Sequence, residues 1–144
     1  MKSNPRFIYN RLRSRGLTHA QACGVLGNIQ QESGFETDVL GFDHTGSYGL
    51  CQWLGPRKRA LEAFSKRTES SMANPLTQID FIFHEFDTTE KRAGLKLREC
   101  DTPGGAALCF SKYYERPHKD YAHNDQRCTY ARQWDAFFQP EHHK

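Results

Sequence analysis

Glu32 lies where a predicted amphipathic helix gives way to Ser33 and Gly34, a position that suits acid–base chemistry. A carboxyl at the C-terminal end of a helix feels the negative end of the helix dipole, and an apolar neighbour such as Phe35 removes water from it. Both effects disfavour the ionised form and raise the pKa of the carboxyl. A carboxyl that keeps its proton near neutral pH can act as a general acid, although most glutamates simply lie on a solvated surface.

Eleven residues further on, Asp43 precedes a second group of chemically useful side chains in the segment 46–53. Tyr48 and Trp53 offer flat faces for sugar rings, and the amide of Gln52 offers both a donor and an acceptor. The glycines of this segment let a bulky polymer approach the backbone. We expect the segment to form one wall of a cleft, in which Asp43 either takes part in the chemistry or caps a turn.

A third group follows later in the chain. Tyr113 and Tyr114 lie on a predicted helix, where they either pack in the core or contact a ligand. The next two residues, Glu115 and Arg116, are interpreted as a structural ion pair, because a guanidinium lowers the pKa of an adjacent carboxyl. The seven histidines include no helical His-Glu-x-x-His pair, so we expect neither a metal nor any other cofactor.

Helix signals dominate the rest of the chain and position these groups. Four predicted helix starts carry a capping residue, with a first-turn proline or a capping box: Asn4-Pro5, Thr18-x-x-Gln21, Asn74-Pro75 and Thr102-Pro103. Two more helices are expected from Gly55-Pro56 and from Asn124 or Asp125. The sequence thus predicts six or seven helices around one glycine-rich segment, 36–55, in which 48–53 forms a short strand.

The composition is that of one globular domain spanning residues 1–144, since 37% of the residues are hydrophobic and 26% are charged. The net charge of +3 fits an ordinary surface or weak attraction to a polyanion. The densest basic cluster, 57–59, is short, and no zinc finger, RNA-recognition motif or P-loop is present. We therefore expect no nucleic-acid partner, with a small nucleic-acid-binding protein kept as an alternative that salt-dependent DNA binding would reveal.

The sequence also bears on where the protein acts. No window approaches the about 20 apolar residues of a membrane span, and no apolar stretch follows the N-terminal basic residues, so we expect neither membrane insertion nor a signal peptide. The five cysteines are an odd number, which leaves at least one thiol unpaired within the chain. The others are either small buried residues or members of one or two disulfides formed in an oxidising compartment.

Two motifs carry a resemblance to known enzymes. Glu32-Ser33-Gly34-Phe35, followed by residues 48–53, resembles the core signature of goose-type lysozymes and soluble lytic transglycosylases. The whole segment 24–35 is more similar to phage tail lysozymes and related phage endolysins. Residues 113–117 resemble the aromatic-Glu-Arg-Pro element of those enzymes, and residues 78–85 are also similar to theirs. The resemblance extends from about residue 5 to residue 138.

The resemblance implies a mainly α, lysozyme-like α+β fold, in which a helical domain and a small β-hairpin region border a glycan-binding cleft. It implies cleavage of the β-1,4 bond between N-acetylmuramic acid and N-acetylglucosamine in bacterial peptidoglycan, with Glu32 as the catalytic acid. We expect a phage endolysin that is made in the host cytoplasm, acts on the wall after release, and is a monomer whose partner is the glycan strand.

The resemblance also assigns roles to the remaining residues. Asp43 would orient the attacking water on the sugar face opposite Glu32, at the carboxyl separation of about 6.5–9.5 Å that a water between two carboxyls needs. The substrate-binding residues implied are Ser33, Tyr48, Gln52, Trp53, Tyr113 and Tyr114. Goose-type enzymes carry a further Asp where this chain has Trp53-Leu54. This departure keeps open both hydrolysis and substrate-assisted transglycosylation by Glu32 alone. A separate alternative is a non-catalytic wall-binding module that kept the groove and lost turnover, although the presence of the acid argues against it.

Overall fold

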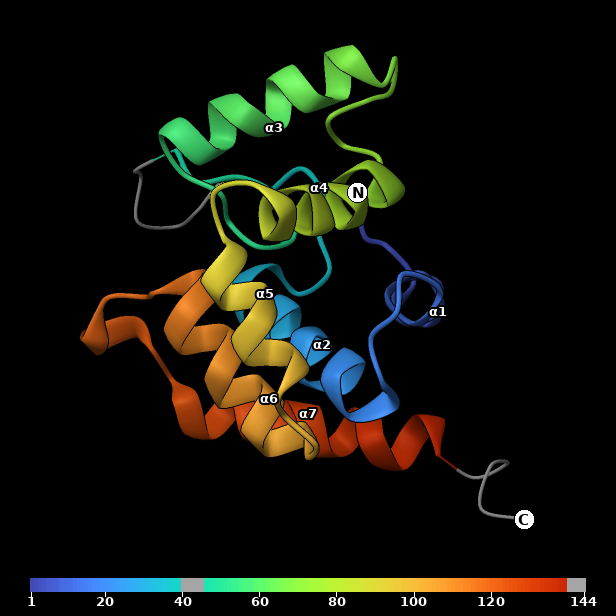
Figure 1. The fold of residues 1–144 in the computed structure, drawn as a ribbon, viewed down its shortest axis with the longest axis vertical. Coiled ribbons are helices and arrows are strands. Elements are labelled where there is room, and N and C mark those ends of the chain that lie inside the picture. The colour runs from blue at the N-terminus through green and yellow to red at the C-terminus, as the bar shows by residue number, and fades with distance from the viewer. Residues whose placement is uncertain (40–45, 140–144) are drawn as a thin grey trace.

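The structure is a computed structural model that describes residues 1–39 and 46–139 (Figure 1). Its helices are α1 (Pro5–Ser14), α2 (His19–Ser33), α3 (Pro56–Arg67), α4 (Pro75–Asp87), α5 (Lys91–Arg98), α6 (Pro103–Phe110) and α7 (Asn124–Phe138). A π-helical turn, η1 (Ser111–Glu115), and a 3-10 turn, η2 (Lys119–Tyr121), connect α6 to α7. The architecture is mainly helical, as the sequence predicts.

The four capping signals of the sequence each begin a helix. Asn4 and Asn74 accept hydrogen bonds from backbone N–H groups two residues ahead, and Thr102 accepts one three residues ahead. Thr18 and Gln21 form the complete capping box at the start of α2. Each cap satisfies an N–H group that the helix itself leaves unpaired, so the local sequence alone is sufficient to place these four starts.

Helix α5 was not predicted, and its sequence explains why. It begins after Glu90 without a side-chain cap, and five of its eight residues are charged or exposed rather than apolar and buried. Its inward face consists of Ala93, Gly94 and Leu97. Packing against α4 and α6 therefore forms this helix, because its own pattern is too short to be distinctive.

The predicted strand at 48–53 is a tight turn instead. Tyr48 and Trp53 pair through two backbone hydrogen bonds of 2.8 and 2.9 Å, which make one isolated bridge. Gly49 and Gln52 between them have φ values of 82° and 56°, so the chain reverses within four residues. The side chain of Gln78 accepts a hydrogen bond from Leu50 N–H at 2.9 Å and supports the turn from α4. The expected β-hairpin is thus not confirmed within the described ranges, where β pairing is limited to isolated bridges.

Helix α2 is the centre of the packing, and it is buried on every side from Gln21 to Ile29. It contacts α6 through Gly24, where an added Cβ would lie 2.5 Å from the Cβ of Ala106. It contacts α7 through Gly27, where an added Cβ would lie 2.5 Å from the carbonyl oxygen of Arg127. The two glycines therefore let three helices approach at backbone distance, which fixes the end of α2 relative to α6 and α7.

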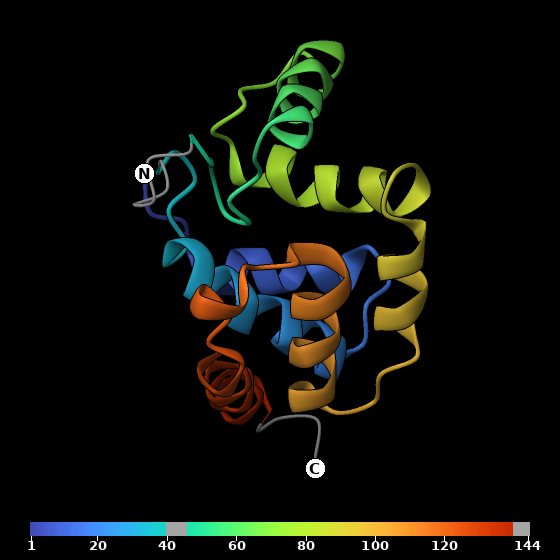
Figure 2. The same ribbon diagram turned by 90° about the vertical axis from the view of Figure 1, so that its left-hand side faces the viewer.

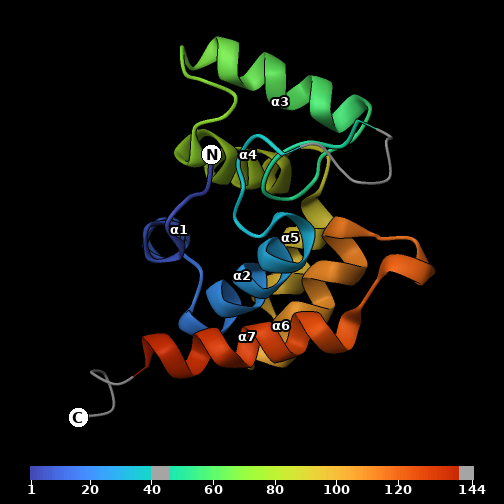
Figure 3. The same ribbon diagram turned by 180° about the vertical axis from the view of Figure 1, so that it is seen from behind.

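The views from two sides show how these helices are arranged. In Figures 1 and 3, α7 runs along one end of the molecule next to α2 and α6, whereas α3 and α4 lie at the opposite end. Figure 2 shows α5 leading from the end of α4 toward α6. Within the described part of the chain, no helix has the length and apolar character needed to cross a bilayer. All five cysteines are free thiols in this structure.

Candidate functional site

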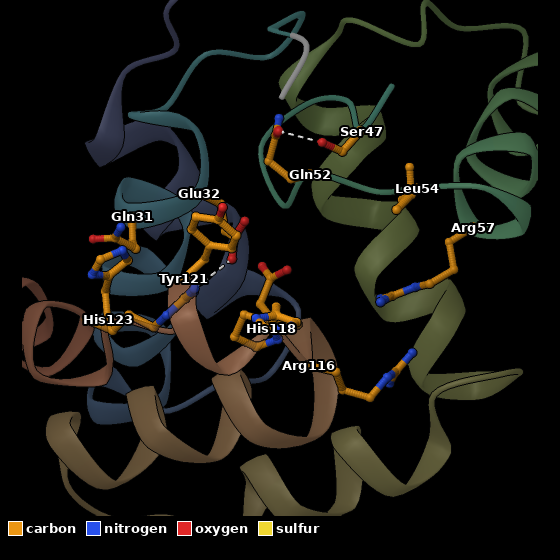
Figure 4. A pocket seen from close by; sticks show the side chains of 13 residues that line it. Gln31, Glu32, Ser47, Gln52, Leu54, Arg57, Arg116, His118, Tyr121 and His123 are labelled. Atoms are coloured by element: carbon orange, nitrogen blue, oxygen red, sulfur yellow. Dashed lines mark hydrogen bonds and ion pairs between the residues drawn. The ribbon is translucent and has the colours of Figure 1, made fainter. Parts of the chain in front are cut away.

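A pocket of about 340 Å³ lies where several chain segments meet (Figure 4). The end of α2, the turn at 47–54, the start of α3, the end of η1, the segment 116–123 and α7 all contribute to its lining. Its volume is within the range of ordinary ligand sites. Figure 4 shows Glu32 and Tyr121 on one side, with Arg57 and Arg116 on the opposite side.

Glu32 occupies the last turn of α2, which ends at Gly34 in the left-handed conformation. Its side chain is 17% exposed and lines the pocket, and its Oε2 accepts a hydrogen bond of 2.8 Å from Nη2 of Arg127. Arg127 is itself buried and donates from Nη1 to Asn28 Oδ1 at 2.8 Å and from Nε to the carbonyl of Ala122 at 2.6 Å. The guanidinium therefore holds the carboxyl in a fixed orientation at the pocket wall.

These surroundings differ from those expected for Glu32. The ring of Phe35 is buried and packs edge-to-face on Trp134 at 5.7 Å, outside the pocket lining. Glu32 pairs with the guanidinium of Arg127, and a guanidinium favours the ionised form of a neighbouring carboxyl. Glu32, which the sequence singled out, lines the pocket, but the sequence did not foresee its partner Arg127, which lies 95 positions later in the chain.

Gln52 lines the same pocket, together with Ser47. Ser47 Oγ donates to Gln52 Oε1 at 2.9 Å, and Gln52 Nε2 donates to the carbonyls of Gly49 and Val39 at 3.0 and 3.2 Å. These bonds hold the amide within its own turn, on a different wall from Glu32 (Figure 4). Of the residues proposed from the sequence, the structure brings Glu32 and Gln52 together in one pocket.

Trp53 and Tyr114 correct the expectation that their rings face a sugar, because both lie in the core. They are 1% and 0% exposed. Trp53 Nε1 donates to Tyr114 Oη at 2.9 Å and to Glu85 Oε1 at 3.1 Å, while Tyr114 Oη donates to the same Oε1 at 2.5 Å. The buried carboxyl of Glu85 gives the polar atoms of both rings an acceptor, so these rings can be buried without loss of hydrogen bonding.

The other proposed residues lie outside this pocket lining. Tyr48 is half-buried with the ammonium of Lys58 5.6 Å from its ring centre, and three cationic side chains lie around the ring of Tyr113. Ser33 Oγ donates to the carbonyl of Ile29 at 3.1 Å, as serines near a helix end often do. Asp43 lies outside the described residues, so its predicted role stays a prediction.

Glu115 is a pocket residue that the sequence interpretation missed, since it was paired with Arg116. Arg116 instead adopts the left-handed conformation with φ of 49°, and its Nη1 donates to Glu90 Oε1 at 2.6 Å. Glu115 stays at the pocket with a buried Oε2 that has no hydrogen-bond partner among the described residues. Burial, followed by the negative charge of Glu32, raises the pKa of Glu115 well above its usual range.

The exposed aromatic face of the pocket comes from the segment 117–122. Both flanking residues, Arg116 and His123, have positive φ, and the ring of Tyr121 between them is 54% exposed. The ring of His118 lies 6.1 Å from that of Tyr121. The sequence showed these side chains only as histidines flanking a tyrosine. In the described part of the chain, no three His, Cys, Asp or Glu side chains converge in an arrangement that could hold a metal ion.

Comparison with known proteins agrees with the motifs read from the sequence. The model of the phage tail lysozyme family matches residues 3–138. The chain belongs to the phage tail lysozyme family. This assignment confirms the resemblance first seen in the segment 24–35.

A curated relative of this phage tail lysozyme is Morphogenesis protein 1 of Bacillus phage B103. The two are 28% identical over 145 residues, which cover 93% of this chain. The same alignment covers 39% of the relative, so the chain spans about two-fifths of the length of the curated protein that it matches.

Proposed function

We propose that this phage tail lysozyme cleaves the β-1,4 bond between N-acetylmuramic acid and N-acetylglucosamine in peptidoglycan, with Glu32 as the general acid. The observation that carries the proposal is the place of Glu32, a partly exposed carboxyl at the end of α2 on a pocket wall. The family match over residues 3–138 supports the substrate class.

The reaction needs one proton and one nucleophile. Glu32 gives its proton to the glycosidic oxygen, the bond from that oxygen to the anomeric carbon of the muramic acid breaks, and positive charge develops on that sugar. A water molecule, or the muramic acid's own hydroxyl, then adds to the anomeric carbon and returns a proton to the carboxylate. The first route yields a reducing end and the second an anhydro ring, and the same acid serves both.

The surrounding residues have complementary roles in this proposal. Arg127 fixes the direction of the Glu32 carboxyl, Gln52 contacts the acetamido group or hydroxyls of a sugar, and Tyr121 offers its exposed face to a ring. In the hydrolytic route Asp43 orients the water. Because Arg127 favours the carboxylate form of Glu32, another group or the bound glycan must favour the protonated form before the first step.

The test is the clearance of purified peptidoglycan by the wild type and by Glu32→Gln. We expect the substitution to lower the rate at least 100-fold, the smaller end of what a general acid contributes. The matched control is Glu36→Gln, a nearby exposed carboxyl outside the pocket lining, which should leave the rate unchanged. Clearance by Glu32→Gln at the wild-type rate would remove Glu32 from the mechanism.

Mass spectrometry of the digested wall separates the remaining routes. Reducing muramic acid ends mean hydrolysis, and anhydro ends mean transglycosylation. Cut peptide cross-links with intact glycan strands would contradict the proposed bond. A wild-type protein that binds peptidoglycan without cutting it would favour a non-catalytic wall-binding module.

We further propose that the protein acts as a phage endolysin on the host wall, after release from the cytoplasm in which it is made. The name of the phage B103 relative favours a second setting, a role in phage morphogenesis. Presence of the protein in purified phage particles would support the second setting, and its confinement to the lysate would support the first.

A further inference from the structure

Two carboxyls from distant parts of the chain line the same pocket. Glu32 ends α2, and Glu115 ends the π-helical turn η1. Helical turns of the π type are rare and often occur at functional sites. The turn ends in the left-handed residue Arg116, whose guanidinium is directed to Glu90. The backbone thus sends the two neighbouring side chains in different directions. Arg116 pairs with Glu90, whereas Glu115 Oε2 has no hydrogen-bond partner among the described residues.

The charged and titratable groups around Glu115 come from four elements. They are Glu32 of α2, Arg127 of α7, Arg57 of α3 and the thiol of Cys51 in the turn at 48–53. In the described structure both guanidinium groups direct their hydrogen bonds elsewhere. Arg57 bonds both oxygens of Glu85 at 2.9 Å, and Arg127 bonds Glu32.

A buried carboxyl without a cation in contact is far more stable with its proton than without it. Glu115 Oε2 is buried and has no hydrogen-bond partner among the described residues. These surroundings favour the protonated form of the Glu115 side chain over the carboxylate. Glu32 is in the opposite situation, because Arg127 at 2.8 Å supports its negative charge. The negative charge of Glu32 in turn disfavours a second negative charge on Glu115.

We propose that Glu115 is a positioning residue that shares one proton with Glu32, and that this shared proton is the one delivered to the glycosidic oxygen. The inference rests on the proposed function. In the resting enzyme the proton is on Glu115. When a glycan fills the pocket and excludes water, Glu32 takes up the proton. Arg127 then faces a neutral Glu32, so its positive charge, together with that of Arg57, lowers the cost of the negative charge left on Glu115. After the bond breaks, the attacking hydroxyl releases a proton that restores the pair.

Carboxyls coupled in this way titrate as a pair rather than singly. The pair of Glu32 and Glu115 keeps one proton up to a higher pH than Glu32 would keep its proton if Arg127 were its only charged neighbour. Glu115 therefore determines the pH at which the activity falls on the high-pH side of the activity profile. A purely structural Glu115 would change the rate to the same extent at every pH.

The decisive variant is Glu115→Gln, which keeps the shape of the neutral acid but cannot exchange a proton. We expect the high-pH limb of kcat/KM on purified peptidoglycan to move to lower pH by about one unit or more, which is a tenfold loss on that limb. At low pH, where Glu32 is protonated without help, the activity should approach that of the wild type. The matched control is Glu62→Gln, an exposed carboxyl of α3, which should reproduce the wild-type profile.

A second measurement does not depend on turnover. With ¹³C-labelled glutamate side chains, the wild-type NMR titration should show that Glu115 keeps its proton to a higher pH than Glu32, and Glu32 of Glu115→Gln should lose its proton in a single step. Loss of the Glu115 proton at a lower pH than the Glu32 proton, an unchanged pH profile, or an equal loss of activity at every pH would each overturn the inference. If Glu32→Gln stays active, the proposed function fails instead. If Glu32→Gln is inactive and Glu115→Gln behaves as wild type, only the shared proton is refuted.

Discussion

Glu85 and Glu115 are both carboxyls with buried oxygens near Arg57, but their hydrogen bonding differs completely. Glu85 Oε1 accepts from Trp53, Tyr114 and Arg57, and its Oε2 accepts from Arg57. By contrast, Glu115 Oε2 is buried and has no partner in the described part of the chain. A saturated carboxylate stabilises the structure around it, whereas an unsaturated one is left with the capacity to exchange a proton.

The same comparison explains where the aromatic residues lie. At the fully hydrogen-bonded Glu85, the rings of Trp53 and Tyr114 are buried in the core, and the Arg57 guanidinium lies 4.4 Å from the Tyr114 ring centre. The unsaturated site opens on the pocket, whose exposed ring is that of Tyr121. The molecule thus uses one acid to assemble the scaffold between α3, α4 and η1, and leaves the other beside Glu32.

The largest expected effect is the difference in stability between Glu85→Gln and Glu115→Gln. Glu85→Gln removes the counter-charge of a largely buried Arg57, so we expect the free energy of unfolding to fall by about 3–5 kcal/mol. Glu115→Gln replaces a neutral acid by a neutral amide, so its change should stay below about 1 kcal/mol. Urea unfolding of both variants measures the difference. Equal losses would mean that the two sites do not differ as the structure indicates.

The next effect is the pH dependence of stability. The folded state raises the pKa of Glu115 above its unfolded value, so it binds more protons than the unfolded state. This contribution is complete below about pH 4.3 and is lost as the pH rises toward the folded pKa, with a slope of at most about 1.4 kcal/mol per pH unit. Thermal unfolding of Glu115→Gln across this pH range should show no such decrease in stability. A parallel pH dependence of wild type and variant would contradict the raised pKa.

The smallest expected effect concerns the aromatic residues. Tyr121→Ala removes the exposed ring from the pocket, so we expect KM for soluble glycan fragments to rise roughly fivefold, equivalent to about 1 kcal/mol of binding. Tyr113→Ala is the matched control, because Tyr113 lies outside the pocket lining, and it should leave KM unchanged. The reverse pattern would return the sugar-binding role to the tyrosine pair proposed from the sequence.

Much of the fold follows from local sequence signals, because capping and helix termination depend on neighbouring residues. The pairs Asn4-Pro5, Asn74-Pro75 and Thr102-Pro103 begin helices as expected, and Gly34 ends α2. The turn at 48–53 was predicted as a strand because Gln52, a residue type that usually avoids positive φ, adopts it here. That conformation depends on bonds made by its side chain and by Gln78, which the local pattern does not reveal.

The site was less predictable, because its decisive contacts join residues that are far apart in the chain. The motif around Glu32 indicated the acid, but Arg127 pairs with it from α7, 95 positions later. Glu115 was assigned to its neighbour Arg116, whereas the π-helical turn and the left-handed residue separate the two. Trp53 looked like a sugar platform because aromatic residues in glycine-rich segments often are exposed. Only the buried acceptor on Glu85 explains its place in the core.

The close approach of α2 to its neighbours has a consequence for protein engineering. Exchanging a glycine inside a helix for alanine normally stabilises a protein by about 0.4–1 kcal/mol, and it is a standard first choice in raising heat tolerance. At Gly24 and Gly27 the new methyl group would overlap α6 and α7 at 2.5 Å. Substitutions meant to raise the thermal stability of this protein therefore belong on outward-facing helix surfaces, such as those of α3, and not at the close contacts around α2.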